Sequence, residues 1–255
     1  IQFTPDLLPS DLTGINYYNM KKSEFEFSPG PVFSNIVLAD EINRATPKTQ
    51  SGLLECMEER QATIDGVTHR LAEPFIVVAT QNPVENAGVY PLPEAELDRF
   101  LFKTSMNYPT HEECVSILDR FDGADPLSEL KPAVGREDII ASQQQLDRVY
   151  VHRDLKDYIA SLCERTREYD NVLLGVSPRG AQSLLRASKG FAAIDGRVYV
   201  QPDDIKRAAA PVLAHRLMLS STARIKRGAA ESIIADILDR VPVPTERGLG
   251  YWQAK

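Results

Sequence analysis

The stretch IVLADEINRA, residues 36–45, is apolar through Ala39 and then ends in two adjacent carboxylates, Asp40 and Glu41. A short, uninterrupted apolar run that is partly β-branched is typical of a strand covered on both faces in a parallel sheet. The carboxyl end of such a strand is the edge at which open α/β sheets bind their ligands. We therefore predict an acidic site at this edge of the sheet.

Two adjacent acids at a strand end can serve attack on a phosphate. Asp40 can hold a hydrated magnesium ion, directly or through water, and Glu41 can orient a water molecule for attack on a phosphate. The alternative interpretation is a surface loop that carries two acids. The abrupt end of a buried strand favours the functional interpretation.

A second apolar run, FIVVA at residues 75–79, leads to Asn82. If this strand lies beside the first, Asn82 emerges at the same edge, where its uncharged amide can bond a phosphate oxygen or hold the attacking water. An Asn-Pro pair after a strand is by itself more often a turn. Its place next to Asp40 and Glu41 favours a role in the site. Residues 101–104 are predicted as a third strand.

The segment after the two acids has the pattern of a helix. Pro47 fits the first helical turn, and Leu53, Leu54 and Met57 repeat at the spacing of a buried stripe. The helix is expected to end in the charged residues 58–60, which we interpret as a solvated helix end.

The order of the predicted elements indicates two domains. QATIDGVTHRL at residues 61–71 has an Asp-Gly pair between two strand-like segments, which predicts a hairpin. Strands that alternate with helices favour an α/β layer fold. From about residue 136 the periodicity is helical almost throughout. We expect an α/β core with a mostly parallel sheet over residues 1–148, followed by a small helical domain over residues 149–255.

Composition and charge disfavour several classes of protein. The 255 residues carry a formal net charge of −7, whereas a general nucleic-acid binder needs a basic surface. No apolar run approaches the roughly 20 residues of a membrane span, and no signal peptide is recognisable, so a cytoplasmic location is expected. The four histidines lack metal-ligand spacing. Cys56, Cys114 and Cys163 are expected to be buried free thiols.

Taken together, the motifs of this chain resemble the MoxR family of AAA+ ATPases. The resemblance lies in LADEINRA, PKTQSGLLE, MEERQATIDG, ATQNP, YPLPEAELDRF and GVSPRG, in this order. It implies a three-layer AAA+ α/β core with a helical lid, and ATP and Mg²⁺ as cofactors. It further implies that Asp40 and Glu41 are the Walker B pair, Asn82 is sensor 1, Arg99 is the arginine finger and Arg179 is sensor 2.

The same resemblance implies an assembly and partners. Residues 5–30 would form the helix-2 insert and residues 61–71 the hairpin before sensor 1, both facing the central pore of a ring, usually a hexamer. Tyr17 and Tyr18 in the insert are either client contacts in the pore or packed side chains. The expected partners carry a von Willebrand factor A domain.

One departure from the family pattern is the phosphate loop, because the sequence contains no GxxxxGK[ST] motif. In the family that loop lies upstream of the segment that resembles Ile1. The sequence thus resembles a chain without its first strand, its Walker A loop and the following helix. ATPase activity is expected of the full-length protein, and these 255 residues alone are expected to be inactive.

Arg99 and Arg179 each have a structural alternative to a role at the nucleotide. For Arg99 the alternative to an arginine finger is an ion pair with Asp98 or Glu96. Arg179 follows Pro178 at a predicted helix start, where a positive charge is mildly unfavourable against the helix dipole. We expect Arg179 to reach the γ-phosphate of a nucleotide held between the two domains of its own subunit, and Arg99 to act across a subunit interface.

The function implied for the full-length protein is ATP hydrolysis that drives chaperone-like remodelling, or metal insertion, in a partner protein. Two alternatives stay open. One is a magnesium-chelatase-like or other helix-2-insert motor, among which a helicase is disfavoured by the acidic charge. The other is a P-loop-less subunit that binds partners and lends Arg99 to its neighbours without catalysis.

Overall fold

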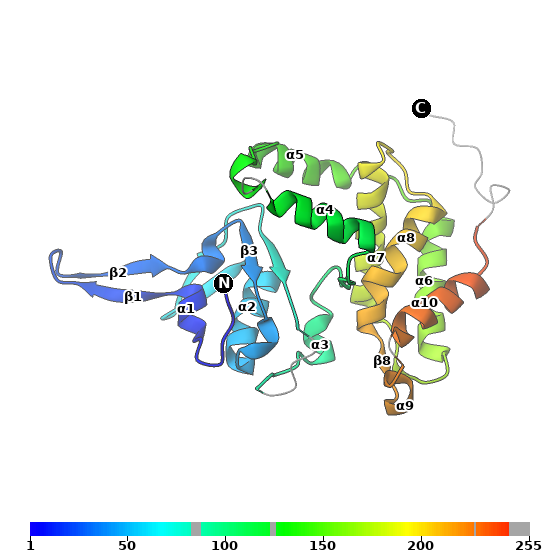
Figure 1. The fold of residues 1–255 in the computed structure, drawn as a ribbon, viewed down its shortest axis with the longest axis horizontal. Coiled ribbons are helices and arrows are strands. Elements are labelled where there is room, and N and C mark those ends of the chain that lie inside the picture. The colour runs from blue at the N-terminus through cyan, green and yellow to red at the C-terminus, as the bar shows by residue number, and fades with distance from the viewer. Residues whose placement is uncertain (83–87, 123–125, 227, 245–255) are drawn as a thin grey trace.

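The computed structural model describes residues 1–82, 88–122, 126–226 and 228–244, and it shows an α/β part beside a helical part (Figure 1). Buried apolar side chains form one cluster between Phe3 and Leu92 and another between Val149 and Val241. The predicted order, an α/β core followed by a helical lid, is confirmed. The domain boundary predicted at residue 148 falls between the two clusters, and the end of the predicted lid, residues 245–255, lies outside the described residues.

The central strands of the α/β part are parallel. β3 (Ile36–Ala39) pairs with β6 (Ile76–Ala79) in a register that sets Ala39 opposite Ala79. On the other side of β3 the chain start continues the sheet, since Asp40 N donates to Ile1 O and Phe3 N donates to Asp40 O, each at 2.8 Å. The two apolar runs lie side by side, which is the condition under which Asn82 was expected at the same edge as the two acids.

One face of β3 is buried and the other is open. Val37 and Ala39 belong to the same buried cluster as the apolar residues of α2 (Pro47–Glu59). Ile36 and Leu38 point the other way and are 65% and 52% exposed. The expectation of a strand covered on both faces is wrong for this structure, because the described residues leave the outer face in solvent.

Residues 101–104 do not form the predicted third strand. Lys103 N donates to Pro211 O of the helical part at 2.9 Å, and Leu101 and Phe102 are 38% and 42% exposed. A strand requires a neighbour whose backbone groups pair with its own along the ladder. The sequence pattern of residues 101–104 indicates an apolar segment, but it does not indicate whether another strand lies beside it.

Two hairpins accompany the sheet. The first follows α1 (Pro9–Thr13) and consists of β1 (Gly14–Asn19) and β2 (Glu24–Pro29), which project from the molecule (Figure 1). The second, β4 (Gln61–Ile64) and β5 (Val67–Arg70), turns at Asp65 and Gly66, which have φ of 50° and 82°. Positive φ at both turn positions is the requirement that an Asp-Gly pair meets, so this predicted hairpin is confirmed.

Three α-helices of the described chain lie between the two buried clusters in the sequence, and none of them contains a buried residue. They are α3 (Glu94–Leu97), α4 (His111–Phe121) and α5 (Arg136–Leu146). Cys114 on α4 is consequently exposed, which corrects the expectation of a buried thiol. Cys56 and Cys163 are buried and free, and burial raises the pKa of each to about 11. Helical periodicity identifies the apolar face of α4 but not whether another element covers it.

The helical part contains the helices α6 (Arg153–Glu168), α7 (Pro178–Ile194), α8 (Pro202–Leu213), α9 (Ser221–Arg224) and α10 (Ala229–Arg240), and the strands β7 (Val172–Leu174) and β8 (Met218–Leu219). Short 3-10 helices occur in both parts of the chain and are η1 (Pro31–Phe33), η2 (Ile42–Arg44), η3 (Pro126–Glu129) and η4 (Ala214–Arg216).

Among the helices that the structure describes, none combines the length and the apolar character needed to cross a bilayer.

A buried ion pair joins the two parts. Asp98, directly after α3, accepts from Arg216 Nε at 2.7 Å and from the Ser177 hydroxyl at 3.1 Å. The Arg216 side chain is only 2% exposed, and it also donates to the backbone carbonyls of Asp98 and Phe100, at 3.0 and 2.8 Å. A buried charge needs such further hydrogen bonds to offset its desolvation. This joint fixes the start of α7 against the segment that carries Arg99.

Candidate functional site

The ends of β3 and β6 are tied together by Thr80. Its hydroxyl donates to Asp40 Oδ1 at 2.5 Å and accepts from Glu41 N at 2.9 Å. The backbone continues the tie, since Thr80 N donates to Ala39 O and Ile42 N donates to Thr80 O, each at 3.0 Å. Sequence reasoning missed Thr80. The available signal was its position directly after the second apolar run, opposite Asp40 in a parallel register.

Glu41 occupies an unusual backbone conformation. Its φ of 53° and ψ of 48° lie in the left-handed region, which is uncommon for a residue with a side chain. Its carboxylate accepts from Gln2 Nε2 at 2.8 Å and pairs with Arg44 at 3.1 Å, and its side chain is 23% exposed. A backbone held in such a conformation at a sheet edge is a reason to suspect function.

The turn after Glu41 is held by the buried side chain of Gln50 in the first turn of α2. Its amide donates to Ile42 O at 3.1 Å, to Ala45 O at 3.2 Å and to Tyr90 O at 2.9 Å. Gln50 is fully buried and was also missed, because a polar residue in a helix pattern gives no sign that it faces the core. It fixes the turn on which Glu41 sits.

Asn82 emerges at the same edge, two positions after Thr80. Its backbone carbonyl accepts from Asn43 Nδ2 at 3.4 Å, and Asn43 is a buried residue of η2. Asp40, Glu41 and Asn82 therefore follow the ends of two paired strands, as expected from the sequence.

Arg99 and Arg179 meet at a different place, on the carboxylate of Glu58. Arg99 Nε lies 3.1 Å from Glu58 Oε2, and Arg179 donates to Glu58 Oε1. Arg99 therefore has a partner other than Asp98 or Glu96, the two proposed from sequence. Glu58 is exposed, as expected for the solvated end of α2, but its carboxylate also joins the core to the lid.

The two groups of residues lie near opposite ends of α2. Gln50 in its first turn bonds to Ile42, next to Glu41, whereas Glu58 is in its last turn. At 1.5 Å per residue, Glu58 lies about 12 Å further along the helix axis. In this structure Arg179 contacts Glu58, whereas the sequence interpretation placed it over the nucleotide of the same subunit.

The arginines line a pocket of about 470 Å³, within the size range of small-molecule sites. Its lining residues are Met57, Glu58, Arg60, Asp98, Arg99, Leu101, Arg179, Gln182, Ser183 and Arg186. Four of them are arginines and two are acids, and Asp98 is already paired with Arg216. The excess of guanidinium groups makes this pocket attractive to an anion such as a phosphate.

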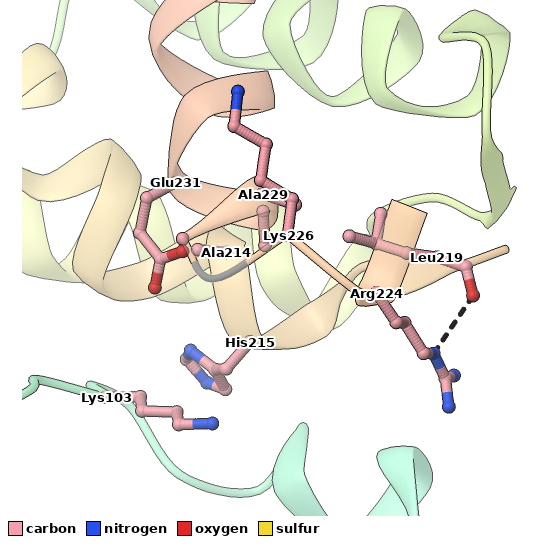
Figure 2. Close-up of a pocket in the computed structure, with 10 residues that line it drawn as sticks. Lys103, Ala214, His215, Leu219, Arg224, Lys226, Ala229 and Glu231 are labelled. Carbon is pink, nitrogen blue, oxygen red and sulfur yellow. Dashed lines mark hydrogen bonds between the residues drawn. The ribbon is translucent and has the colours of Figure 1, made fainter. Parts of the chain in front are cut away.

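Another pocket, of about 250 Å³, lies between Lys103 and the first turn of α10 (Figure 2). His215 lines it with Arg224 and Glu231, and none of the residues predicted for the site does. Burial, together with the charge of Arg216, lowers the pKa of His215 to about 4. The ring is therefore neutral near pH 7, and its Nε2 lies 3.1 Å from the carbonyl of Phe100.

The acidic edge fits a magnesium ion that is shared with a phosphate. Among the described residues, no group of three or more His, Cys, Asp and Glu side chains could enclose a metal. Mg²⁺ commonly uses one or two carboxylates and takes its other ligands from water and phosphate. Asp40 offers such a carboxylate, with Oδ1 held by Thr80.

Comparison with known protein families gives matches to both parts. Residues 1–102 match the ATPase family associated with various cellular activities (AAA), and residues 164–237 match the AAA lid domain. The matches fall on the α/β part and on the helical part respectively.

Individual proteins match nearly the whole chain. YeaC of Bacillus subtilis is 50% identical over 247 residues, which is 97% of this chain and 77% of YeaC. The chaperone MoxR1 of Mycobacterium tuberculosis is 40% identical over 253 residues, which is 96% of this chain and 67% of MoxR1. A crystal structure of a Cytophaga hutchinsonii protein superposes with a TM-score of 0.88 at 41% identity, over 96% of this chain and 77% of that one.

Proposed function

The chain belongs to the MoxR family of AAA+ ATPases, and from this premise we propose that the full-length protein hydrolyses ATP at sites shared between neighbouring subunits of a ring. The observation that carries the proposal is the distribution of the predicted residues about α2. Asp40, Glu41 and Asn82 lie at the sheet edge, whereas Arg99 and Arg179 lie together on Glu58 near the other end of this helix.

The acidic edge supplies the half of the site that holds the nucleotide. Asp40 would hold Mg²⁺, which, when bound, neutralises charge on the phosphate oxygens. Glu41 accepts the proton of the attacking water, and the Asn82 amide orients that water. In the present structure Glu41 is engaged by Gln2 and Arg44, so it has to turn from these partners to reach the water.

The arginine pair supplies the other half, from the neighbouring subunit. Arg99 stabilises the charge that develops on the transferred phosphoryl group, as an arginine finger does. Arg179 shares its carboxylate partner and faces the same pocket, so we assign it to the neighbour's nucleotide as well. This proposal differs from the same-subunit role that the sequence resemblance implies.

The work of the ring is chaperone-like remodelling of partner proteins. The 40% identity to a protein named a chaperone favours chaperone-like remodelling over the magnesium-chelatase-like alternative. We propose six subunits per ring and clients with a von Willebrand factor A domain, both on the family resemblance. The projecting β1–β2 hairpin, with Tyr18 and Phe25 51% and 74% exposed, is the described surface best placed to contact a client.

The test is the concentration dependence of ATP hydrolysis by the full-length protein. Turnover per subunit should rise through the concentration range in which light scattering shows assembly, because each site needs two subunits. Turnover per subunit that stays constant while the assembly dissociates would overturn the shared site. No hydrolysis by the assembled protein would favour the P-loop-less subunit that only binds partners.

A further inference from the structure

Glu58 is the group on which the two arginines converge, and from the sequence we expected only a solvated helix end at this position. We propose that Glu58 is a positioning residue, which holds Arg99 and Arg179 side by side so that both present free N–H groups to one phosphate. This inference rests on the proposed function, in which these arginines serve a neighbouring subunit.

The contacts leave most of each guanidinium available. Glu58 Oε2 meets Arg99 at Nε, 3.1 Å away, and Oε1 meets Arg179 at one terminal nitrogen. Each guanidinium carries five N–H donors in a fixed plane. One contact per arginine therefore sets the direction of the plane without using the remaining donors.

The local charges explain why an acid is needed at this position. Two arginines directed at one point repel each other, and Arg60 and Arg186 line the same pocket. Asp98, the other acid of the lining, is occupied by Arg216 and Ser177. Of the acids that line the pocket, this leaves Glu58 to offset the repulsion between Arg99 and Arg179.

The backbones of the two arginines are already fixed by the joint between core and lid. Asp98 directly precedes Arg99 and bonds to Ser177, which caps the helix in whose first turn Arg179 lies. Glu58 then determines only where the side chains point. Its removal should disturb the geometry of the arginines without releasing the lid, which the Asp98–Arg216 pair still holds.

The chain offers a matched control in Glu59, the next residue of α2, which is exposed and pairs with no described residue. We expect full-length Glu58→Gln to lose between about 10-fold and 100-fold in kcat, the scale of a small misplacement of catalytic groups, with little change in KM for ATP. Glu59→Gln should keep the wild-type kcat. Both variants should unfold in urea at nearly the same midpoint as the wild type, because exposed ion pairs contribute little to stability.

A double-mutant cycle separates positioning from a general structural effect. In the Arg179→Ala background there is no arginine pair to align. The fold-decrease in kcat caused by Glu58→Gln should therefore be several-fold smaller in this background than in the wild type. Equal losses in both backgrounds, or a kcat of Glu58→Gln that matches Glu59→Gln, would overturn the inference. An increase in kcat would also overturn it, since Glu58 would then restrain the arginines. If Arg99→Ala and Arg179→Ala themselves keep full activity, the proposed function fails, and this outcome is distinct from a failure of Glu58 alone.

Discussion

Thr80 and Asp40 share a hydrogen bond of 2.5 Å that joins the ends of the two parallel strands. The same hydroxyl accepts from the backbone N–H of Glu41 at 2.9 Å. One side chain directly after β6 thus holds the Asp40 carboxylate and the Glu41 backbone at the end of β3. The positions of the carboxylates depend on a residue that neither belongs to their strand nor carries charge.

Replacing Thr80 with Val should loosen this edge, because Val keeps the shape of Thr without its hydroxyl. We expect ATP hydrolysis by the full-length protein to fall about 10-fold, as the acids lose their alignment. The free energy of unfolding should fall by no more than about 1 kcal/mol, the usual size of one hydrogen bond. Thr80→Ser keeps the hydroxyl and is the control. Equal activity of the Val and Ser variants, measured by phosphate release, would contradict this role.

Glu41→Gln in the full-length protein removes the proposed base and keeps its size. Hydrolysis should fall by roughly 100-fold or more, within the range of a positioned general base, while ATP still binds. Calorimetric titration measures the binding, and phosphate release measures the turnover. Glu55→Gln, on the exposed side of α2, is the control and should behave as the wild type. Undiminished turnover of the Glu41 variant would remove this residue from the mechanism.

The sequence predicted the features that depend on local chemistry. An apolar run that ends in Asp40 and Glu41, and another that leads to Asn82, specify strand ends, and two such strands in parallel meet at one edge. The Asp65–Gly66 turn was equally local, since its positive φ values follow from the two residues themselves.

The features that could not be predicted depend on how distant elements dock. The pairing of Glu58 with Arg179 joins residues 121 positions apart, and it requires the lid to sit on the C-terminal end of α2. The same dependence explains Cys114, whose helix has an apolar face that the described residues leave uncovered.

The 255-residue chain alone should bind ATP weakly, because it contains no GxxxxGK[ST] motif. In P-loop enzymes the backbone amides and lysine of that loop make most of the phosphate contacts. Calorimetric titration of the chain with ATP and magnesium should show no submicromolar binding, whereas the full-length protein is the positive control. Submicromolar binding by the chain alone would mean that the described residues hold the nucleotide without such a loop.

The stability of the lid should depend on pH through His215. Burial and the neighbouring Arg216 lower its pKa to about 4, against an ordinary value of about 6.5. Between these pH values the unfolded chain binds a proton that the folded chain does not, so stability falls as the pH falls. The difference between these two pKa values corresponds to a contribution to stability on the order of a few kcal/mol.

Urea unfolding of His215→Gln and the wild type at several pH values tests this dependence. The stability advantage of the wild type should shrink as the pH falls from about 6.5 to about 4, because only the wild type has this group to protonate. His111→Gln, at an exposed position of α4, should show no such change. An advantage that stays constant across this range would contradict the neutral, buried ring.

Mixing inactive variants distinguishes the two possible targets of Arg179. Full-length Glu41→Gln still carries both arginines, and Arg179→Ala still carries Glu41. If Arg179 serves the neighbouring subunit, a mixed ring contains interfaces at which an intact Glu41 meets an intact Arg179, and hydrolysis should reappear. If Arg179 serves its own subunit, every subunit in the mixture lacks one of the two groups and no site is restored.

The same mixture made with Arg99→Ala is the internal reference, because an arginine finger acts across an interface under either model for Arg179. Recovery with both arginine variants supports the arrangement on Glu58, in which Arg99 and Arg179 point to the same neighbour. If hydrolysis reappears only in the mixture with Arg99→Ala, Arg179 serves the nucleotide of its own subunit, and the proposal is contradicted. If neither mixture regains hydrolysis although labelled subunits exchange, either the ring needs all its sites to be intact or Arg99 does not act in trans. Adding wild-type subunits in excess distinguishes these two explanations.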